Sequence, residues 1–147
     1  MSKAETAENL FESYNCAQSV LAAYAGDYGL DKEKALQLAA GFGAGMGRLQ
    51  ETCGAVNGAI MVLGLNSGFK EGDSKEKTHD FYAKVRRLVG DFTAQKGTVR
   101  CRDLLGGCNL LSEDGQKFFK EHNLKNNCRE YVRLCCELLD KYLKSSG

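Results

Sequence analysis

Apolar residues recur every three or four positions along most of the chain, which is the spacing of helices that bury one face. The first of these stripes consists of Leu10, Tyr14, Ala17, Leu21 and Tyr24. No segment of useful length alternates β-branched and polar residues in the way that predicts a strand. We therefore expect an all-α fold, a bundle of about five to seven helices.

Capping residues and glycines divide this pattern into separate helices. After the first stripe, the expected helices cover approximately residues 32–40, 52–65, 74–95, 99–105, 112–122 and 127 onwards. Proline is absent, so nothing places a hard stop inside them. No linker and no internal repeat interrupts the chain, and we expect residues 1–147 to form a single domain.

A glycine-rich stretch precedes the most apolar of these helices, with Gly41, Gly43, Gly45 and Gly47 at alternate positions. A dinucleotide fingerprint would follow a strand, and a phosphate loop would end in Gly-Lys-Ser/Thr, but here the flanking segment is helical and Arg48 follows the last glycine. No nucleotide site is expected. The stretch predicts a bend, or a place where the backbone comes very close to another group.

The helix after this bend begins with small residues, Gly54, Ala55, Gly58 and Ala59, that form one smooth face. Such a face lets either another backbone or a compact cofactor approach closely at Gly54 and Gly58. Tight helix packing is the simpler interpretation. Smooth faces of this kind would also permit a homodimer without requiring one.

Composition and charge narrow the class of protein. Charged residues make up 27% of the chain and leave a net charge of +1, so no basic excess predicts nucleic-acid binding. The start of the chain lacks the basic and apolar regions of a signal peptide. The longest apolar run, residues 55–65, is too short to span a membrane. We expect a soluble, cytoplasmic protein with no membrane insertion.

Seven cysteines are many for an intracellular chain of this size, and an odd number argues against a disulfide framework. Metal ligation, thiol chemistry and simple burial remain as explanations. No pair has CxxC spacing, which excludes a zinc ribbon or a ferredoxin-type run, and no cis-proline accompanies the cysteines as in thioredoxin-like folds. Cys16, Cys53, Cys101 and Cys128 fall in four different predicted helical segments, so the fold itself must assemble any site.

Each of these four cysteines follows a candidate capping residue; the pairs are Asn15–Cys16, Thr52–Cys53, Thr98–Cys101 and Asn127–Cys128. Free N–H groups at a helix start would favour thiolate over thiol. The unbroken apolar stripe around Asn15 leaves open that this residue lies inside a longer helix. Cys53, with the clearest cap, is predicted to be the most reactive thiol. Arg48 and Glu51 flank it and are expected at the surface, like His79 and His122.

The residues around Cys53 also form a specific motif. Residues 53–58 read CGAxxG, and GFGAGMGRLQET precedes them. Further cysteines stand in YNCAQSVL at Cys16, in CRDLL at Cys101 and in CREYV at Cys128. With these features the chain resembles, from about Leu10 to its C-terminal helix, a family of redox-active proteins named for its cysteine signature, C_GCAxxG_C_C.

The resemblance implies a redox role for Cys16, Cys53, Cys101 and Cys128. Related domains in some multihaem cytochromes imply that the four can bind an iron–sulfur cluster, whereas haem is not implied because the chain has no CxxCH motif. The remaining cysteines lie outside the signature, as packing residues or as resolving thiols for a disulfide; they are Cys108, Cys135 and Cys136.

Three hypotheses follow. The first is a redox protein, either an electron-transfer protein with a four-cysteine iron–sulfur centre or an oxidoreductase that exchanges disulfides with a partner protein. The second is a metal-binding protein without redox work, with a structural zinc site or a sensor site at the same four residues. The third is a helical interaction module whose cysteines are merely buried. No arrangement of residues predicts hydrolase chemistry.

Overall fold

The computed structural model of the chain describes residues 1–145, so the last two residues of the predicted 1–147 domain lie outside it. The described residues form an all-α fold whose only β-pairing is an isolated antiparallel bridge between Thr52 and Arg100. The α-helices are α1 (Lys3–Leu10), α2 (Cys16–Ala25), α3 (Lys32–Ala39), α4 (Gly43–Met46), α5 (Gly54–Ser67), α6 (Lys75–Lys96), α7 (Cys101–Leu104), α8 (Glu113–Glu121) and α9 (Lys125–Ser145). Short 3₁₀ turns follow α2 and α3.

Most predicted helix starts are confirmed. The side chains of Asp31, Ser74 and Ser112 accept hydrogen bonds from the third backbone N–H of α3, α6 and α8. The described residues form more helices than expected because the first stripe is broken into α1 and α2 and because the glycine-rich stretch contains the short α4. Asn15 follows the segment that separates α1 from α2, and it caps α2. Its side chain accepts a hydrogen bond from the Gln18 N–H at 2.9 Å, and the Gln18 side chain accepts one from the Asn15 N–H at 3.0 Å.

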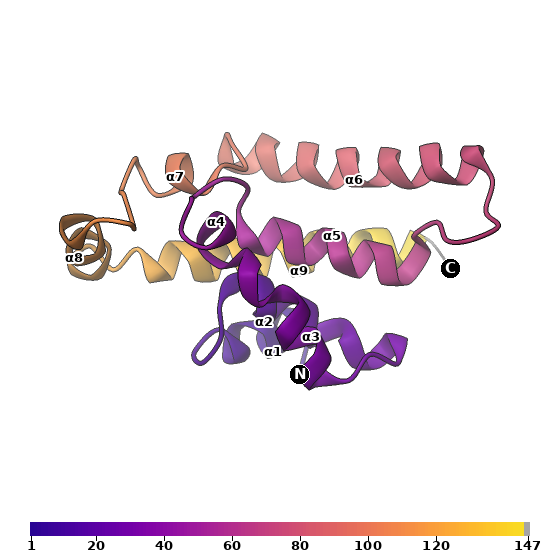
Figure 1. Cartoon of the computed structure of the whole chain (residues 1–147), viewed down its shortest axis with the longest axis horizontal. Coiled ribbons are helices and arrows are strands. Elements are labelled where there is room, and N and C mark those ends of the chain that lie inside the picture. Colours follow the sequence, from indigo (N-terminus) through magenta and orange to yellow (C-terminus); the bar gives the residue numbers. More distant parts are fainter. Residues whose placement is uncertain (146–147) are drawn as a thin grey trace.

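The long helices share one apolar core. Leu88 and Phe92 of α6 and Val132 and Leu139 of α9 are almost fully buried. The α6, α5 and α9 ribbons run alongside one another in Figure 1, and α1 to α3 lie beneath them. This body of packed helices holds the shorter segments in place.

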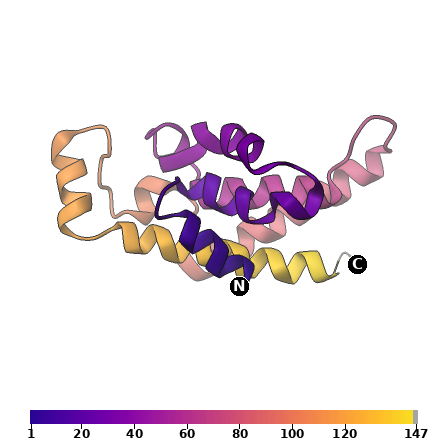
Figure 2. The same cartoon turned by 90° about the horizontal axis from the view of Figure 1, so that it is seen from below.

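The shorter segments gather at one end of the molecule. Figures 1 and 2 show α8 at this end, next to the beginning of α9, and in Figure 1 α7 and α4 lie between α8 and the ribbons of α6 and α5. A second, smaller apolar cluster holds them together, formed by Cys101, Leu105, Cys108 and Leu110. Within the described part of the chain, no helix combines the length and the apolar character needed to cross a bilayer.

Candidate functional site

The glycine-rich stretch forms a left-handed turn. Backbone φ angles are 52° at Ala44, 65° at Gly45, 71° at Met46 and 56° at Gly47. Left-handed backbone costs a residue with a side chain about 1–2 kcal/mol, and Gly45 and Gly47 adopt it without that cost. It continues at Arg48 and Gln50, whose φ angles are 69° and 59°. The predicted bend is confirmed, and it is sharper than a change of helix direction.

The end of this turn pairs with the segment before α7. The backbone N–H of Cys53 donates to the Val99 carbonyl at 2.7 Å, and the N–H of Cys101 donates to the Glu51 carbonyl at 2.6 Å. These two bonds run in opposite directions between the same short segments, on either side of the Thr52–Arg100 bridge. They place Cys53 and Cys101 side by side although 47 residues separate them in the sequence.

Close packing of α2 on α5 brings Cys16 to the same place. A Cβ atom on Gly58 would lie 2.8 Å from the Ala17 carbonyl oxygen, so this glycine serves helix packing. A Cβ atom on Gly54 would clash with the Cys16 sulfur and would lie 2.7 Å from the Phe42 carbonyl oxygen. The expected close approach thus occurs at both glycines, but only Gly54 faces the cysteines.

All four signature cysteines line one cavity of about 160 Å³. Its other lining residues are mainly apolar: Phe11, Asn15, Ala44, Gly54, Leu104, Leu105, Leu110, Phe119 and Tyr131. A cavity of about 150 Å³ in another protein holds a benzene molecule, so this one has room for a compact group of several atoms. The structure therefore assembles the four residues that the sequence selected, from four separate segments.

Gln50 is a part of the site that the sequence did not indicate. It is fully buried, its Nε2 donates to the Cys108 carbonyl at 2.7 Å, and its Oε1 accepts from Leu110 N at 2.8 Å. Its amide also lies beside Cys101 and lowers the pKa of that thiol, although burial outweighs this. Gln50 thus ties the left-handed turn to the loop after α7. Its only signal in the sequence was a polar residue beside the glycines.

Burial controls the protonation of the four thiols. It raises the pKa of Cys101 to about 11 and that of Cys128 to about 12, and it raises the pKa of Cys16 and of Cys53 as well. Backbone N–H groups do face two of them, Ala44 and Ala17 at Cys16 and Val56 and Ala55 at Cys53, but desolvation is the larger effect. The N–H groups thus act in the predicted direction at Cys16 and Cys53, but burial outweighs them in the protein without a bound cation.

Three of the predicted caps are wrong. Cys53 itself is the N-cap of α5, and Thr52 forms the bridge to Arg100 instead. Cys101 is the first residue of α7, and Thr98 accepts a hydrogen bond from Arg100 N rather than capping the helix. Cys128 lies inside α9, where its N–H donates to the Leu124 carbonyl. The wrong caps arose because polar residues before a cysteine also occur in bridges and inside helices.

The three remaining cysteines differ in their surroundings. Cys108 is buried and its sulfur donates to the Gly115 carbonyl at 3.0 Å. Cys135 and Cys136 are buried on α9 within the main core. These three are not among the residues that line the cavity. His79 and His122 are exposed, as expected, and so are Arg48 and Glu51.

The donor set determines which metal group these residues fit. Among the described residues, no group of three or more His, Cys, Asp or Glu side chains is arranged so that it could hold a metal ion. Four sulfur ligands of a single zinc ion would converge to about 2.3 Å from one point. Here the four sulfur-bearing residues line a cavity with room for a compact group of several atoms. Four cysteine thiolates are the usual ligands of iron–sulfur clusters.

The fold and the cavity define an all-helical protein with a four-cysteine site. The family model described as "Putative redox-active protein (C_GCAxxG_C_C)" matches residues 14–142, which include all four cysteines. The chain belongs to this family of redox-active proteins. A search of curated proteins and a search of solved structures each gave no match.

Proposed function

We propose that the protein transfers electrons through an iron–sulfur cluster held by Cys16, Cys53, Cys101 and Cys128. The observation that carries this proposal is the convergence of the four cysteines on one apolar cavity of about 160 Å³. Four separate segments contribute one cysteine each, and random burial of cysteines would not select these four and leave out Cys108, Cys135 and Cys136. A bound cluster supplies a centre that takes up and releases single electrons.

The chain's own residues perform three tasks at this site. The cysteine side chains provide sulfur ligands, and the local cations of a cluster would offset the burial that otherwise keeps these thiols protonated. Apolar residues such as Phe11, Leu105 and Phe119 exclude water, which lowers the local dielectric and affects the reduction potential. Backbone N–H groups at the start of α5 face Cys16 and Cys53 and would tune that potential further.

Disulfide exchange is the less favoured mechanism for the same residues. It requires an accessible thiolate, because the thiolate is the attacking species. The side chains of Cys53 and Cys101 are buried and burial raises the pKa of both. A structural zinc site would need the four sulfur atoms to converge on one point, and among the described residues no group is arranged to hold a single metal ion.

The test is to purify the protein without oxygen and to measure iron, acid-labile sulfide and the visible spectrum. We expect a brown protein whose absorbance bleaches on reduction and returns on reoxidation. Zinc in place of iron would overturn the electron-transfer proposal in favour of a structural or sensor site. A colourless, metal-free protein whose four cysteines form a reversible disulfide would overturn it in favour of thiol exchange.

A further inference from the structure

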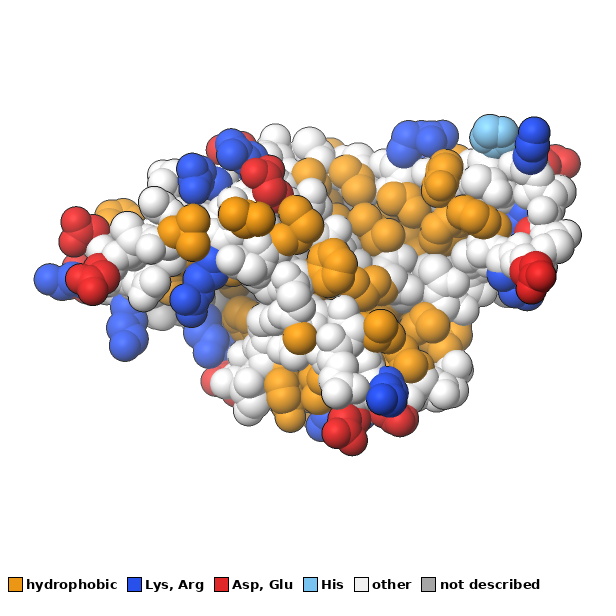
Figure 3. Space-filling model, in the orientation of Figure 1, with side chains coloured by type: hydrophobic (Ala, Val, Ile, Leu, Met, Phe, Trp, Pro, Cys, Tyr) orange, Lys and Arg blue, Asp and Glu red, His pale blue; other side chains and the backbone are white. Residues whose placement is uncertain are grey.

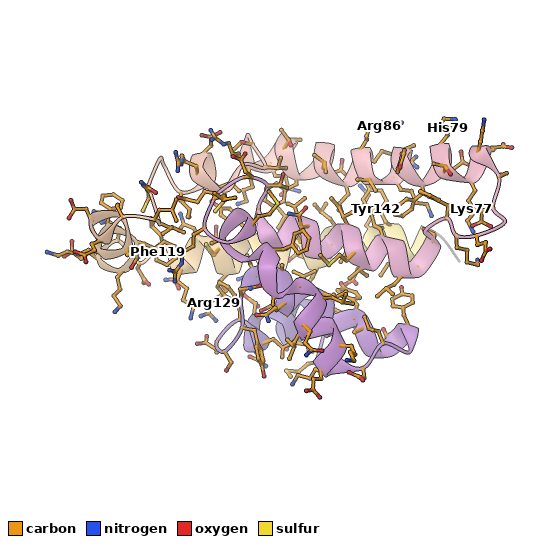
Figure 4. The ribbon with its side chains drawn as sticks, viewed as in Figure 1. Lys77, His79, Arg86, Phe119, Arg129 and Tyr142 are labelled. Atoms are coloured by element: carbon orange, nitrogen blue, oxygen red, sulfur yellow. The ribbon has the colours of Figure 1, made fainter. Side chains whose placement is uncertain are left out.

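A second hollow lies next to the cysteine cavity. It is a groove of about 740 Å³, within the range of about 300–1,000 Å³ that is usual for small-molecule sites. Ala44, Leu110 and Phe119 line both the groove and the cavity, so the two share a wall. Figure 4 labels Phe119 on α8, next to the beginning of α9. A molecule seated in the groove would lie against the wall of the cysteine site.

The groove is strongly basic. Arg48, Lys117, Lys120 and Lys125 line it together with the polar residues Gln116 and Asn123, and among its described lining residues none is Asp or Glu. In Figure 3, blue side chains lie over this part of the face, around α8 and the beginning of α9. Because the whole chain has a net charge of only +1, this concentration of positive charge is a local feature.

The acidic residues nearby offset the charge of the groove only in part. Glu121 pairs with the lining residue Lys117 at 3.8 Å. Glu12 pairs with Arg129, which lies outside the lining, and interacts less strongly with Lys125. The Lys125 ammonium lies 5.4 Å from the ring centroid of Phe11, a residue of the cysteine cavity. Among the described residues, Arg48, Lys120 and Lys125 have no ion pair, so their charges face the groove's contents and solvent.

We propose that this groove binds a small anion that carries carboxylate or phosphate groups, and that this anion is a one-electron acceptor whose uncharged part is reduced as the cysteine site is oxidised. The binding site stands on the shape and charge of the groove, whereas the role of the anion as reactant rests on the proposed function. The apolar wall at Leu110 and Phe119 would contact the uncharged part of the molecule, and the lysines would contact its charged groups.

The test is a titration of the full-length protein with inorganic pyrophosphate and, separately, with citrate, followed by calorimetry. We expect saturable binding of one probe or both at low ionic strength, weakened by added salt. Pyrophosphate alone would indicate a phosphate ligand, and citrate alone would indicate a carboxylate ligand. The double variant Lys120→Glu/Lys125→Glu should weaken binding at least about tenfold, since it reverses two of the four charges.

The matched control is Lys75→Glu/Arg86→Glu, which makes the same change in net charge with two exposed residues of α6. Arg86 is labelled in Figure 4, far along α6 from α8. The control should bind the probes as wild type does. Lys120→Gln/Lys125→Gln provides a milder variant, and circular dichroism checks that each protein is folded. Equal binding to all variants, or no binding to wild type, would overturn the inference.

A second readout separates this inference from the proposed function. Oxidation of the cysteine site by trianionic ferricyanide should slow several-fold in the groove variant, while oxidation by cationic hexaammineruthenium(III) should speed up. For each reagent, the oxidation rate of the variant is divided by that of the wild type, so the intrinsic reactivity of the reagent cancels. Anion binding that is lost in the variant, in a protein that neither reagent oxidises, would support the groove and contradict the redox function. Equal ratios for the two reagents would contradict the inference that the groove binds the anion that reacts with the cysteine site.

Discussion

The cysteine cavity and the core between α6 and α9 contain the same kinds of residue but differ in construction. Both bury leucines, aromatic rings and cysteines. The core is built from the apolar faces of packed helices, among them the long helices α6 and α9, and Cys135 and Cys136 fill space within it. The cavity is built from ends of helices and from a left-handed turn, and its four cysteines surround open volume.

This difference shows that burial of a cysteine does not by itself mark a site. Close packing is the ordinary state of a protein interior, and open volume beside several cysteines departs from it. Left-handed backbone at Ala44 and Met46 is a further departure, and strain of this kind collects at functional sites. The two regions should therefore respond differently to substitution.

The largest expected effect on stability lies in the core. Leu139→Ala removes a fully buried side chain, and we expect the free energy of unfolding to fall by about 2–5 kcal/mol. Residue 139 lies roughly 16 Å along the helix axis from Cys128, so the folded variant should keep its bound metal. Urea denaturation and metal analysis check the two parts. Loss of metal from the folded variant would mean that the regions are coupled.

Gly54→Ala should affect the cysteine site directly, unlike Leu139→Ala. The added methyl group would meet the Cys16 sulfur and the Phe42 carbonyl, so we expect a loss of about 1–3 kcal/mol together with loss of bound metal. The matched control is Gly90→Ala on α6, where a Cβ atom meets nothing within 4 Å. That change should stabilise the protein by about 0.5–1 kcal/mol and leave the site intact. Similar behaviour of the two variants would contradict the close approach at Gly54.

Gln50→Met tests the two hydrogen bonds by which Gln50 joins the left-handed turn to the loop after α7. It leaves the Cys108 carbonyl and the Leu110 N–H without their partner, which should cost about 1–2 kcal/mol of unfolding free energy. Gln116→Ala is the control, since its exposed side chain makes one bond, to the Leu110 carbonyl. It should cost about 0.5 kcal/mol. If thermal denaturation showed equal losses of stability in the two variants, Gln50 would not be what joins the turn to the loop.

The fold could be predicted from the sequence because its signals are local. Helices such as α3, α6 and α8 are marked by a capping residue and an apolar stripe, and each predicted cap formed. The cap of α2 at Asn15 was indicated by the partner three residues later, against an apolar stripe that ran through it. Local pattern therefore determined most of the architecture.

The site was only partly predictable because it depends on contacts between distant segments. The identity of the four cysteines followed from the motif and its resemblance, but the bonds that join residues 50–53 to 99–102 have no local signal. Thr52 illustrates this, because pairing with Arg100 overrode its capping preference. The protonation of the thiols also depends on burial, which no spacing reveals. The predicted cytoplasmic location stays a prediction.

The smallest expected effect concerns pH in the protein without bound metal, and here the two regions should behave alike. Burial raises the pKa of Cys53 in the cavity and of Cys135 in the core. The folded state thus keeps protons that the unfolded chain loses above a pKa of about 8.5, so stability is full below that pH and falls as pH rises. Cys53→Ala and Cys135→Ala should each flatten this fall by up to about 1.4 kcal/mol per pH unit.

Urea denaturation between about pH 7 and pH 9.5 measures this slope, and the pH range brackets the ordinary thiol pKa. A slope that neither variant changes would mean that these thiols titrate as freely in the fold as in the unfolded chain. A change of slope in only one variant would mean that the thiols of the two regions differ in their access to solvent.

The central claim is that four of the seven cysteines form one site. The most direct measurement is the iron content of seven single Cys→Ser variants purified without oxygen. We predict loss of iron when the residue lines the cavity, at Cys16, Cys53, Cys101 and Cys128. We predict iron equal to wild type when it does not, at Cys108, Cys135 and Cys136. Iron that is retained in all seven variants, or lost equally from folded variants of both groups, would contradict the account.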